Sequence, residues 1–293
     1  MVRLAAFLVC AVLAACSGGD APPVLETGRE TGLGAATEVG ARPMRIVSLD
    51  YCADQYVLKL ADRAQILAVS PDAGADFSHM RAAARGLPTV RPVAEDVLVL
   101  RPDLVVRAHG GGPNAAAFFQ RAGIPVLQVG WATTLDDGAP TSIAAIIEHM
   151  AAGLGQAERG AAVLANFRAR LAAAGPRARG VTALYMTPAG VTTGPGSLIH
   201  EMLTAAGLEN FETARGWRAL PLERLAYEQP GLVVASFFET LTNHPNAWSA
   251  ARHPVARAQL DGPGTVPLQG AWTACGAWFL MDAVEALAAA APP

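Results

Sequence analysis

This sequence lacks several features that would assign it to a common functional class. Lys59 is its only lysine, the net charge is -3, and no run of lysine and arginine occurs among the 293 residues. Proteins that bind nucleic acids usually carry a basic patch, so we expect no nucleic-acid partner. The sequences His-Glu-x-x-His, Cys-x-x-Cys and Gly-x-Ser-x-Gly are also absent. Their absence removes the usual signatures of a zinc hydrolase, a redox dithiol and a serine hydrolase.

The N-terminal segment has the pattern of a secretion signal. Met1-Val-Arg3 is followed by an apolar stretch from Leu4 to Ala15, which is too short to cross a bilayer. We therefore predict a signal peptide over residues 1–15. No second apolar run reaches the length of about eighteen residues that a transmembrane helix needs, so we expect contact with a membrane only through a lipid anchor.

The end of the apolar stretch supplies that anchor. Leu13-Ala-Ala-Cys16 resembles the lipobox of bacterial lipoproteins, which implies that Cys16 is lipidated and that the chain works in the periplasm. Ser17, by similarity to lipoprotein sorting signals, implies the inner leaflet of the outer membrane. Residues 16–43 are then the lipidated cysteine and a flexible tether rich in Gly, Pro, Thr and Glu. The alternative is ordinary secretory cleavage after Ala15.

Two segments 128 positions apart share one pattern. Glu95 and Glu223 are each followed by six residues, a proline, one further residue and Leu-Val-Val. A proline ends a helix, and a β-branched apolar run is typical of a buried strand. The repeat therefore predicts two similar α/β lobes, each with a glutamate at the start of an equivalent short helix.

Strands and helices alternate along the chain, which predicts an α/β fold with mostly parallel sheets flanked by helices. The expected strands are 45–49, 66–69, 104–106, 125–129, 181–186 and 232–235. The expected helices are 53–60, 95–100, 114–122, 198–206, 222–227 and 274–290. Residues 142–150 and 156–173 carry no strand signal, and we expect a long connecting helix there, broken or kinked near Gly153-Leu-Gly155.

These elements divide the chain into two lobes of comparable organisation. We assign 44–140 to an N-terminal α/β lobe, 141–174 to the connecting helix, and 175–293 to a C-terminal α/β lobe. Together they form one bilobal protein of about 250 residues, which is enough chain for a large core. A cleft between two such lobes is a usual location for a ligand.

Several segments together resemble the substrate-binding proteins of iron-chelate and vitamin B12 ABC importers. They are Arg45 to Asp54, the two glutamate–proline repeats, Gly123-Ile-Pro-Val126, and Thr193-Gly-Pro-Gly-Ser197 before a helix. The resemblance extends from roughly Pro43 to the C-terminus. It implies a monomeric protein without enzymatic activity or a cofactor, whose bound metal chelate is its cargo. It also implies that a rigid helix joins the lobes and permits only modest closure.

The resemblance gives the repeated glutamates a role. In this family one exposed glutamate from each lobe pairs with arginines of the permease dimer, which works with an ATPase, and Glu95 and Glu223 match those positions. Charge-assisted pairs with arginine are directional and steer the encounter of two proteins. The alternative is that each glutamate only complements a helix dipole. Their equivalent placement in the repeat favours permease docking.

Candidate ligand contacts lie on loops that follow the expected strands. Aromatic side chains there would bury a large planar chelate, and His109 stands beside a run of glycines where a backbone can approach a ligand closely. Trp217 resembles a cleft tryptophan of the vitamin B12-binding member of the family. The predicted ligand-binding residues are Tyr51, His109, Trp131, Trp217, Phe238 and Trp272. The alternatives are that each aromatic is a packing residue and that His109 is a solvated loop residue.

Two cysteines remain once the signal and the lipid site are set aside. In an oxidising compartment, Cys52 and Cys275 could form a disulfide. The other alternative is a pair of soft donors near a ligand. The sequence does not choose between them, because bridging depends on the separation of the Cα atoms.

The composition then favours one cargo. Almost all basic residues are arginine, which suits anionic ferric complexes, so we predict a binding lipoprotein that captures a ferric siderophore or haem and delivers it to the permease. Vitamin B12 or cobinamide is the alternative cargo, favoured by Trp217, Trp272 and His109. A tetrapyrrole or metal-chelate enzyme and a lipoprotein sensor are alternatives of other classes. A free-metal binder would require histidines to converge in the cleft, the candidates being His79, His109, His200 and His244.

Overall fold

The computed structural model describes residues 42–174, 180–238 and 248–291. The predicted signal peptide, Cys16, Ser17 and most of the predicted tether lie outside these ranges, as does His244. Within the described ranges, no helix has both the length and the apolar character needed to cross a membrane.

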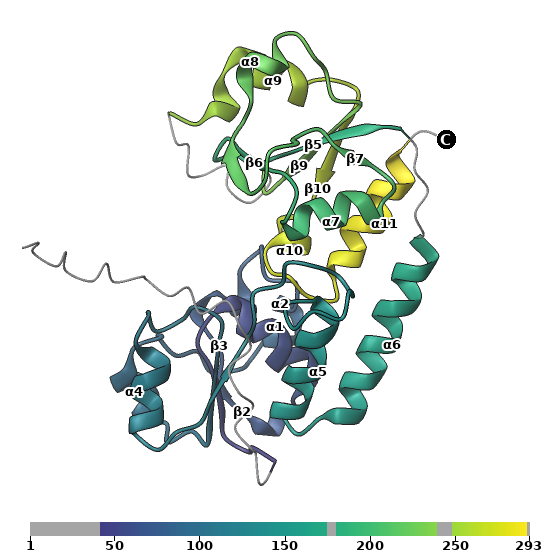
Figure 1. Cartoon of the computed structure of the whole chain (residues 1–293). Coiled ribbons are helices and arrows are strands. Elements are labelled where there is room, and N and C mark those ends of the chain that lie inside the picture. Colours follow the sequence, from purple (N-terminus) through teal and green to yellow (C-terminus); the bar gives the residue numbers. More distant parts are fainter. Residues whose placement is uncertain (1–41, 175–179, 239–247, 292–293) are drawn as a thin grey trace, which may run out of the picture. The chain divides into compact units, whose positions relative to one another are not determined.

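Two four-stranded parallel sheets form the framework (Figure 1). The first sheet has the order β2-β1-β3-β4 and the second the order β10-β9-β5-β7. The strands of the first sheet are β1 (Ile46–Ser48), β2 (Ile66–Ala68), β3 (Leu104–Arg107) and β4 (Val126–Gln128). Those of the second are β5 (Thr182–Met186), β7 (Glu209–Asn210), β9 (Leu232–Ser236) and β10 (Thr265–Leu268). The predicted α/β class with parallel sheets is confirmed.

The two sheets have the same connectivity. Strands β1, β2, β3 and β4 occupy the same relative places as β5, β7, β9 and β10. The Leu-Val-Val segments of the sequence repeat are β3 and β9, and both are internal strands. The helices that precede them are α3 (Ala94–Val99) and α8 (Leu222–Leu225), and those that follow are α4 (Ala115–Arg121) and α9 (Pro254–Leu260). The sequence repeat is therefore a repeat of topology.

Both sheets are buried on two faces, as helices on each side of a parallel sheet require. Successive residues of a strand point to opposite faces, and neighbours accordingly belong to different cores: Ile46 to a large core and Val47 to a smaller one. In the second sheet, Val234 joins the same large core, whereas Val233 joins a third. One continuous apolar core thus contacts both sheets.

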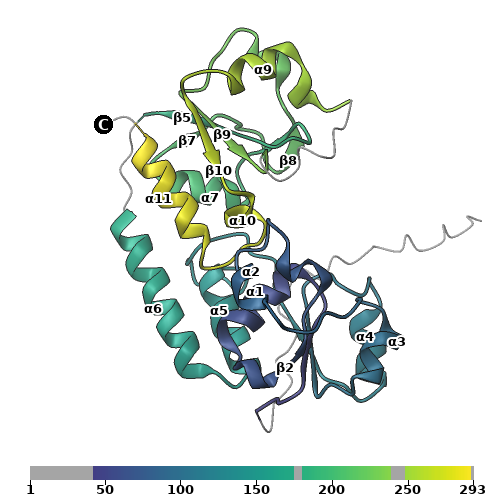
Figure 2. The same ribbon diagram turned by 180° about the vertical axis from the view of Figure 1, so that it is seen from behind.

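The five longest helices within the described ranges contribute to the large core (Figures 1 and 2). Each supplies buried apolar side chains, such as Tyr56, Ile147, Phe167 and Met281. These helices are α1 (Tyr51–Leu60), α5 (Ile143–Gly153), α6 (Ala157–Ala174), α7 (Leu198–Ala205) and α11 (Leu280–Ala290).

The predicted connecting stretch is two helices rather than one. Helices α5 and α6 run side by side in opposite directions (Figures 1 and 2). The chain reverses at Gly155, whose φ of 67° lies in the region that favours glycine. The helices approach closely, because a Cβ atom on Gly160 would lie 2.1 Å from the Cβ atom of Ala151. The break predicted near Gly153 is confirmed, and the chain forms a helical hairpin there instead of a straight rod.

The C-terminal helix is shorter than the sequence predicts. The prediction of one helix over 274–290 is wrong at its start. The short helix α10 (Gly270–Thr273) ends before this range, and α11 begins only at Leu280. Between them, Cys275 is bonded to Cys52, and a Cβ atom on Gly276 would lie 2.5 Å from the Cβ atom of Ala132. These tertiary contacts, together with the low helix propensity of Gly276, keep the segment from forming a helix.

A small antiparallel pair in the second lobe was not predicted. Strands β6 (Val191–Thr193) and β8 (Trp217–Ala219) form a separate two-stranded sheet. Each has only three residues, and a pattern of period two is hard to recognise over so short a run. The pair has no counterpart in the first lobe's sheet, and it carries Trp217, one of the predicted ligand contacts.

Candidate functional site

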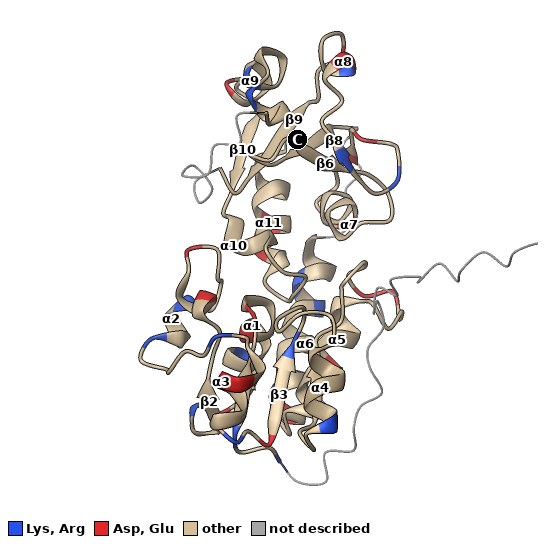
Figure 3. Cartoon of the chain, turned by 90° about the vertical axis from the view of Figure 1, so that its left-hand side faces the viewer, with Lys and Arg blue, Asp and Glu red and all other residues tan. Residues whose placement is uncertain are grey.

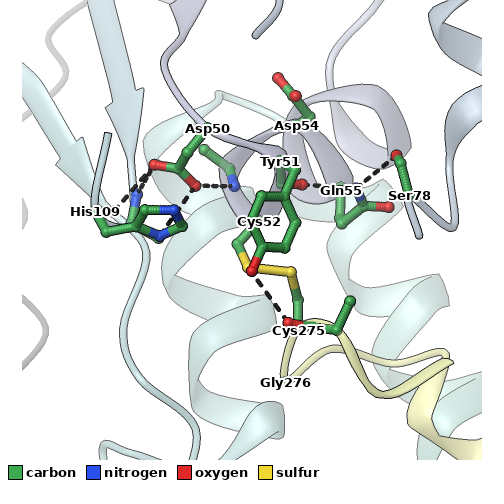
Figure 4. The surroundings of a disulfide bond; sticks show 12 residues. Asp50, Tyr51, Cys52, Asp54, Gln55, Ser78, His109, Cys275 and Gly276 are labelled. Atoms are coloured by element: carbon green, nitrogen blue, oxygen red, sulfur yellow. Dashed lines mark hydrogen bonds and ion pairs between the residues drawn. A yellow bond between two sulfur atoms is a disulfide. The ribbon is translucent and has the colours of Figure 1, made fainter. Parts of the chain in front are cut away.

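A disulfide joins helix α1 to the segment that precedes α11 (Figure 4). The sulfur atoms of Cys52 and Cys275 are 2.07 Å apart and their Cα atoms 5.6 Å apart. Beside it, the hydroxyl of Tyr56 donates a hydrogen bond to the carbonyl of Gly276 at 3.0 Å. Of the two alternatives that the sequence left open, the structure contains the disulfide. It fixes the first lobe to the C-terminal segment at the point where the candidate site begins.

Asp50 organises the loops around this point. Its carboxylate is 5% exposed and accepts a hydrogen bond from the backbone N–H of Ala53 at 3.0 Å, which caps α1. The other carboxylate oxygen accepts from the N–H groups of Ala108, His109 and Gly110 at 2.7, 3.0 and 2.8 Å. Asp50 was not among the site residues predicted from the sequence, although an aspartate directly before a helix is a recognisable N-cap signal.

The glycine run after β3 has a structural purpose. A Cβ atom on Gly110 would lie 2.4 Å from the carbonyl oxygen of Leu49, so only glycine fits there without movement. Gly111 and Gly112 have φ values of 80° and 81°, which also favour glycine. The buried guanidinium of Arg107 donates to the carbonyls of Gly110 and Gly112 at 2.8 and 3.0 Å. The loop that carries His109 is therefore closely held.

Tyr51 and His109 lie together at the edge of this loop (Figure 4). Their ring centroids are 5.5 Å apart in an edge-on contact, and Tyr51 makes a similar contact with Phe77 at 5.1 Å. Burial, followed by the charges of Asp50 and Asp72, raises the pKa of Tyr51 and keeps its phenol protonated. The His109 side chain is 55% exposed, and its Nδ1 lies 3.8 Å from the Asp50 carboxylate. The structure therefore brings two predicted ligand residues into one exposed cluster.

The other four candidates are distributed over both lobes. Trp131 and Trp217 are 66% and 56% exposed, and the Trp217 ring lies edge-on to buried Tyr185 at 6.2 Å. Phe238 and Trp272 are half-buried and pack on apolar cores. Among the described residues, no ring contact joins these four to the pair of Tyr51 and His109. The expectation that all of them lie on loops is not met, because Trp217 is on β8 and Trp272 is on α10, whereas Trp131 and Phe238 are on loops.

Several buried hydroxyl groups of the second lobe were not predicted from the sequence. The hydroxyls of Ser236 and Thr273 are 2.7 Å apart. Burial raises the pKa of Tyr185, although the same two hydroxyls act in the opposite direction. The buried hydroxyls of Thr192 and Thr193 have no hydrogen-bond partner within the described part of the chain. Nothing in the one-dimensional pattern marks these residues, since Tyr185, Ser236 and Thr273 come together only when β5, β9 and α10 pack.

The repeated glutamates occupy equivalent and exposed positions. Glu95 is in the first turn of α3, Glu223 is in the first turn of α8, and both side chains face solvent. Figure 3 shows acidic residues on both helices. The structure describes no ion pair for either glutamate within residues 42–174, 180–238 and 248–291.

Within the described ranges, no group of three or more His, Cys, Asp or Glu residues could hold a metal ion. His79 instead stacks on Phe279 with ring centroids 4.3 Å apart, and its Nε2 lies 3.1 Å from a carboxylate oxygen of Asp282. His200 lies on α7, and His244 is outside the described residues. The free-metal set considered from the sequence is therefore not assembled by its described members.

A hollow of about 390 Å³ lies beside β2, lined by residues of the segments 69–76 and 81–89. Its lining includes Asp76, Arg81 and Arg85. None of the six predicted ligand residues lines it, so the candidate ligand cluster is a separate feature of the surface.

A duplicated arrangement of parallel strands, with candidate ligand residues on loops after those strands, is the framework of a two-lobed binding protein. The sequence profile of the periplasmic binding protein family matches residues 46–243, more than half of the chain, and the chain belongs to this family. Family membership implies a substrate-binding protein of a transporter, not an enzyme, and a periplasmic location. A search of curated proteins finds no match.

Three solved structures illustrate the similarity of fold. The periplasmic heme-binding protein RhuT from Roseiflexus sp. RS-1 has 22% identity and a TM-score of 0.65, covering 84% of this chain and 97% of that one. The Fe3+-hydroxamate transport protein from Saccharomonospora viridis has 20% identity and a TM-score of 0.60, covering 85% and 93%. The vitamin B12 binding protein BtuF of Vibrio cholerae has 21% identity and a TM-score of 0.57, covering 85% and 96%. All share the two-lobed fold.

Proposed function

We propose that this chain is the substrate-binding component of an ABC importer and that its cargo is an iron chelate, either a ferric siderophore or haem. The observation that carries the proposal is the family match over residues 46–243. Structures of the same fold described as binding haem and Fe3+-hydroxamate support the choice of cargo. Arginine, which supplies all but one of the 22 basic residues, suits the anionic groups of such chelates.

The pair of Tyr51 and His109 gives the first lobe two different contacts. Nδ1 of His109 lies 3.8 Å from the Asp50 carboxylate, too far for a hydrogen bond, so either ring nitrogen is available to a metal or to a hydrogen-bond partner. Tyr51 is protonated in the free protein because its pKa is raised, so it can donate a hydrogen bond or supply an apolar wall, and ligation of ferric iron through its phenolate would require release of that proton. His109 is the metal donor in this proposal.

The remaining candidate contacts would complete the site from two loops, from strand β8 and from helix α10. Trp131 and Trp217 present exposed rings, and such rings cover planar ligands at low entropic cost. Phe238 and Trp272 contribute half-buried apolar surface. Vitamin B12 or cobinamide is the second candidate cargo, which the exposed Trp217 favours, as does the fold shared with the vitamin B12 binding protein of Vibrio cholerae.

The proposal includes delivery as well as capture. Glu95 and Glu223 dock the two lobes on the permease dimer of the importer, whose ATPase drives transport. A lipid on Cys16 holds the monomeric protein at the inner leaflet of the outer membrane, as Ser17 implies. The lobes, residues 44–140 and 175–293, hold the cargo in the cleft between them.

Tryptophan fluorescence tests the binding function. The protein is titrated with ferric siderophores, haem, cobalamin and cobinamide, with corrections for the absorbance of these coloured ligands. We expect saturable one-to-one quenching by a ferric siderophore or by haem. Quenching by cobalamin or cobinamide alone would transfer the proposal to the second cargo, and silence across the panel would contradict both.

Absorption spectra of haem then test the donor. We expect His109→Ala to weaken haem binding at least about tenfold, a loss typical of one good metal or hydrogen-bond contact, and to change the spectrum of the bound haem. His253→Ala is the matched control, because His253 is also an exposed histidine but lies at the start of α9. Equal spectra for the two variants would remove His109 from the site.

A further inference from the structure

Each sequence repeat places a large apolar side chain four residues after its glutamate. Val99 follows Glu95 and Tyr227 follows Glu223 at the same spacing. The exposed fractions of Val99 and Tyr227 are 81% and 91%. Single exposed apolar residues are common on protein surfaces, but exposure at the same position of both repeats calls for a shared cause.

Helical geometry places each apolar residue beside its glutamate. Residues four apart lie on one face of a helix, and α3 contains both Glu95 and Val99. Helical hydrogen bonding continues past the end of α8, because the N–H of Glu228 donates to the carbonyl of Arg224 at 2.8 Å. Tyr227 therefore lies one turn after Glu223, in the arrangement that Val99 has with Glu95.

The neighbouring cations are occupied within the protein. Nε of Arg91 lies 2.6 Å from the carboxylate of Asp96, and Nε of Arg224 lies 2.7 Å from that of Glu228. Arg224 also covers the ring of Phe211 at 3.8 Å. In the described structure the two repeat glutamates thus have a carboxylate free for an external cation, next to an apolar side chain that is free to contact the same partner.

We propose that Val99 and Tyr227 are apolar contacts of the docking surface, one beside each glutamate. This inference rests on the proposed function. The occupant is a permease with two equivalent subunits, each presenting a cationic side chain next to an apolar surface. An exposed ion pair contributes only about 0–1 kcal/mol, whereas a tyrosine buried at the centre of an interface often supplies much of the binding, and surrounding apolar contacts exclude water from it. The two surfaces are the pairs Glu95–Val99 and Glu223–Tyr227.

Crosslinking in cells tests the position of these contacts. A photoreactive phenylalanine analogue is introduced at position 99, 227 or 162 of the full chain, and crosslinked partners are identified by mass spectrometry. Ala162 is the matched control, because it is an exposed residue of α6 four positions after the exposed Glu158. We expect an integral membrane permease subunit to be crosslinked from 99 and 227 but not from 162. Equal crosslinking from all three positions, or none from 99 and 227, would overturn the inference.

Association with the permease so identified, held with its ATPase in lipid nanodiscs, tests the energetics. We expect Tyr227→Ala to weaken association about tenfold and Val99→Ala about threefold, since the larger ring buries more area. Chelate affinity and the unfolding temperature should not change. Wild-type association by both variants, with loss of association by the variant Glu95→Ala/Glu223→Ala, would overturn the apolar contacts alone. Wild-type association by all of them would overturn the docking role of the glutamates as well.

Discussion

Asp54 is a buried carboxyl group on α1 that links the stability of the protein to pH. Burial raises its pKa to about 6 from the usual 3.8, against the hydrogen bonds from Ser70, which act in the opposite direction. The hydroxyl and N–H of Ser70 donate to its two oxygens at 2.5 and 3.1 Å. Because the folded protein favours the protonated form, stability from this group is complete below pH 3.8 and is lost as the pH rises through about 6.

Replacing Asp54 by Asn removes this dependence, because the amide is neutral at every pH. Between pH 4 and pH 7, the free energy of unfolding of Asp54→Asn should gain about 2 kcal/mol relative to the wild type. Urea unfolding at four pH values in that range measures the difference. The exposed Asp76 serves as the control, and Asp76→Asn should show no such gain. A constant difference between Asp54→Asn and wild type would contradict the buried, protonated state.

Gly110 is the second residue on which the site depends. A Cβ atom at this position meets the carbonyl oxygen of Leu49 at 2.4 Å, so Gly110→Ala should lower the free energy of unfolding by about 1–3 kcal/mol. It should also weaken chelate binding, because His109 is the adjacent residue. Gly74→Ala is the matched control, since nothing lies within 4 Å of its added Cβ. Equal unfolding curves for the two variants would show that the loop is not closely held.

At the scale of elements, the sequence predicted the parts that repeat. The glutamate–proline pattern identified α3, α8, β3 and β9, because a buried parallel strand is a continuous apolar run and is easily recognised. It could not identify the antiparallel pair of β6 and β8, whose strands are short, nor the break between α10 and α11. In the run from Ala274 to Phe279 only the two alanines are strong helix formers and Gly276 disfavours a helix, a signal that we did not use; the disulfide and the close packing of Gly276 show why the run is not helical.

Part of the candidate site could also be predicted from the sequence. Tyr51 and His109 follow β1 and β3, which are neighbours in the sheet, so their loops must lie at the same edge. Asp50, which holds those loops, has a local capping signal that we did not use. The buried hydroxyl pair of Ser236 and Thr273 could not have been found, because side chains from distant segments meet only through tertiary packing.

The disulfide between α1 and the segment before α11 should contribute substantially to stability. It closes a loop with a sequence separation of 223 residues, and disulfides of this kind typically contribute about 2–4 kcal/mol. The variant Cys52→Ser/Cys275→Ser should lose that amount in urea unfolding. Reduction of the wild type should reproduce the loss, and the variant should not respond to reductant. Two alkylatable thiols in a non-reduced Cys16→Ser protein would contradict the disulfide.

At the scale of the whole molecule, three features connect the two sheets. They are the continuous apolar core, the disulfide, and an ion-pair cluster in which Arg170 of α6 binds Asp282 and Glu285 of α11 at 2.7 Å each. Packed helices with such links move by small sliding rather than by wide hinge rotation. The protein is therefore suited to close only modestly on its cargo.

Delivery depends on both lobes at once. The variant Glu95→Ala/Glu223→Ala should bind its chelate with wild-type affinity, because within the described residues no hydrogen bond or ion pair joins either carboxylate to Tyr51 or His109. It should support no uptake, because both carboxylates are exposed for a partner. Glu158→Ala is the matched control, since Glu158 is also an exposed glutamate in a first helical turn, and it should support normal uptake. Wild-type uptake by the double variant would contradict the docking role.

The most direct test of iron-chelate capture is native mass spectrometry, combined with iron analysis, of the protein purified from the periplasm of the cells that produce it. We predict one bound small molecule per chain, released on unfolding, whose mass and iron content are those of a ferric siderophore or haem. Loss of this ligand from a His109→Ala protein purified in parallel would place it at the proposed site. A bound corrinoid, a bare metal ion, or a chain that never carries a small molecule would contradict the capture of an iron chelate.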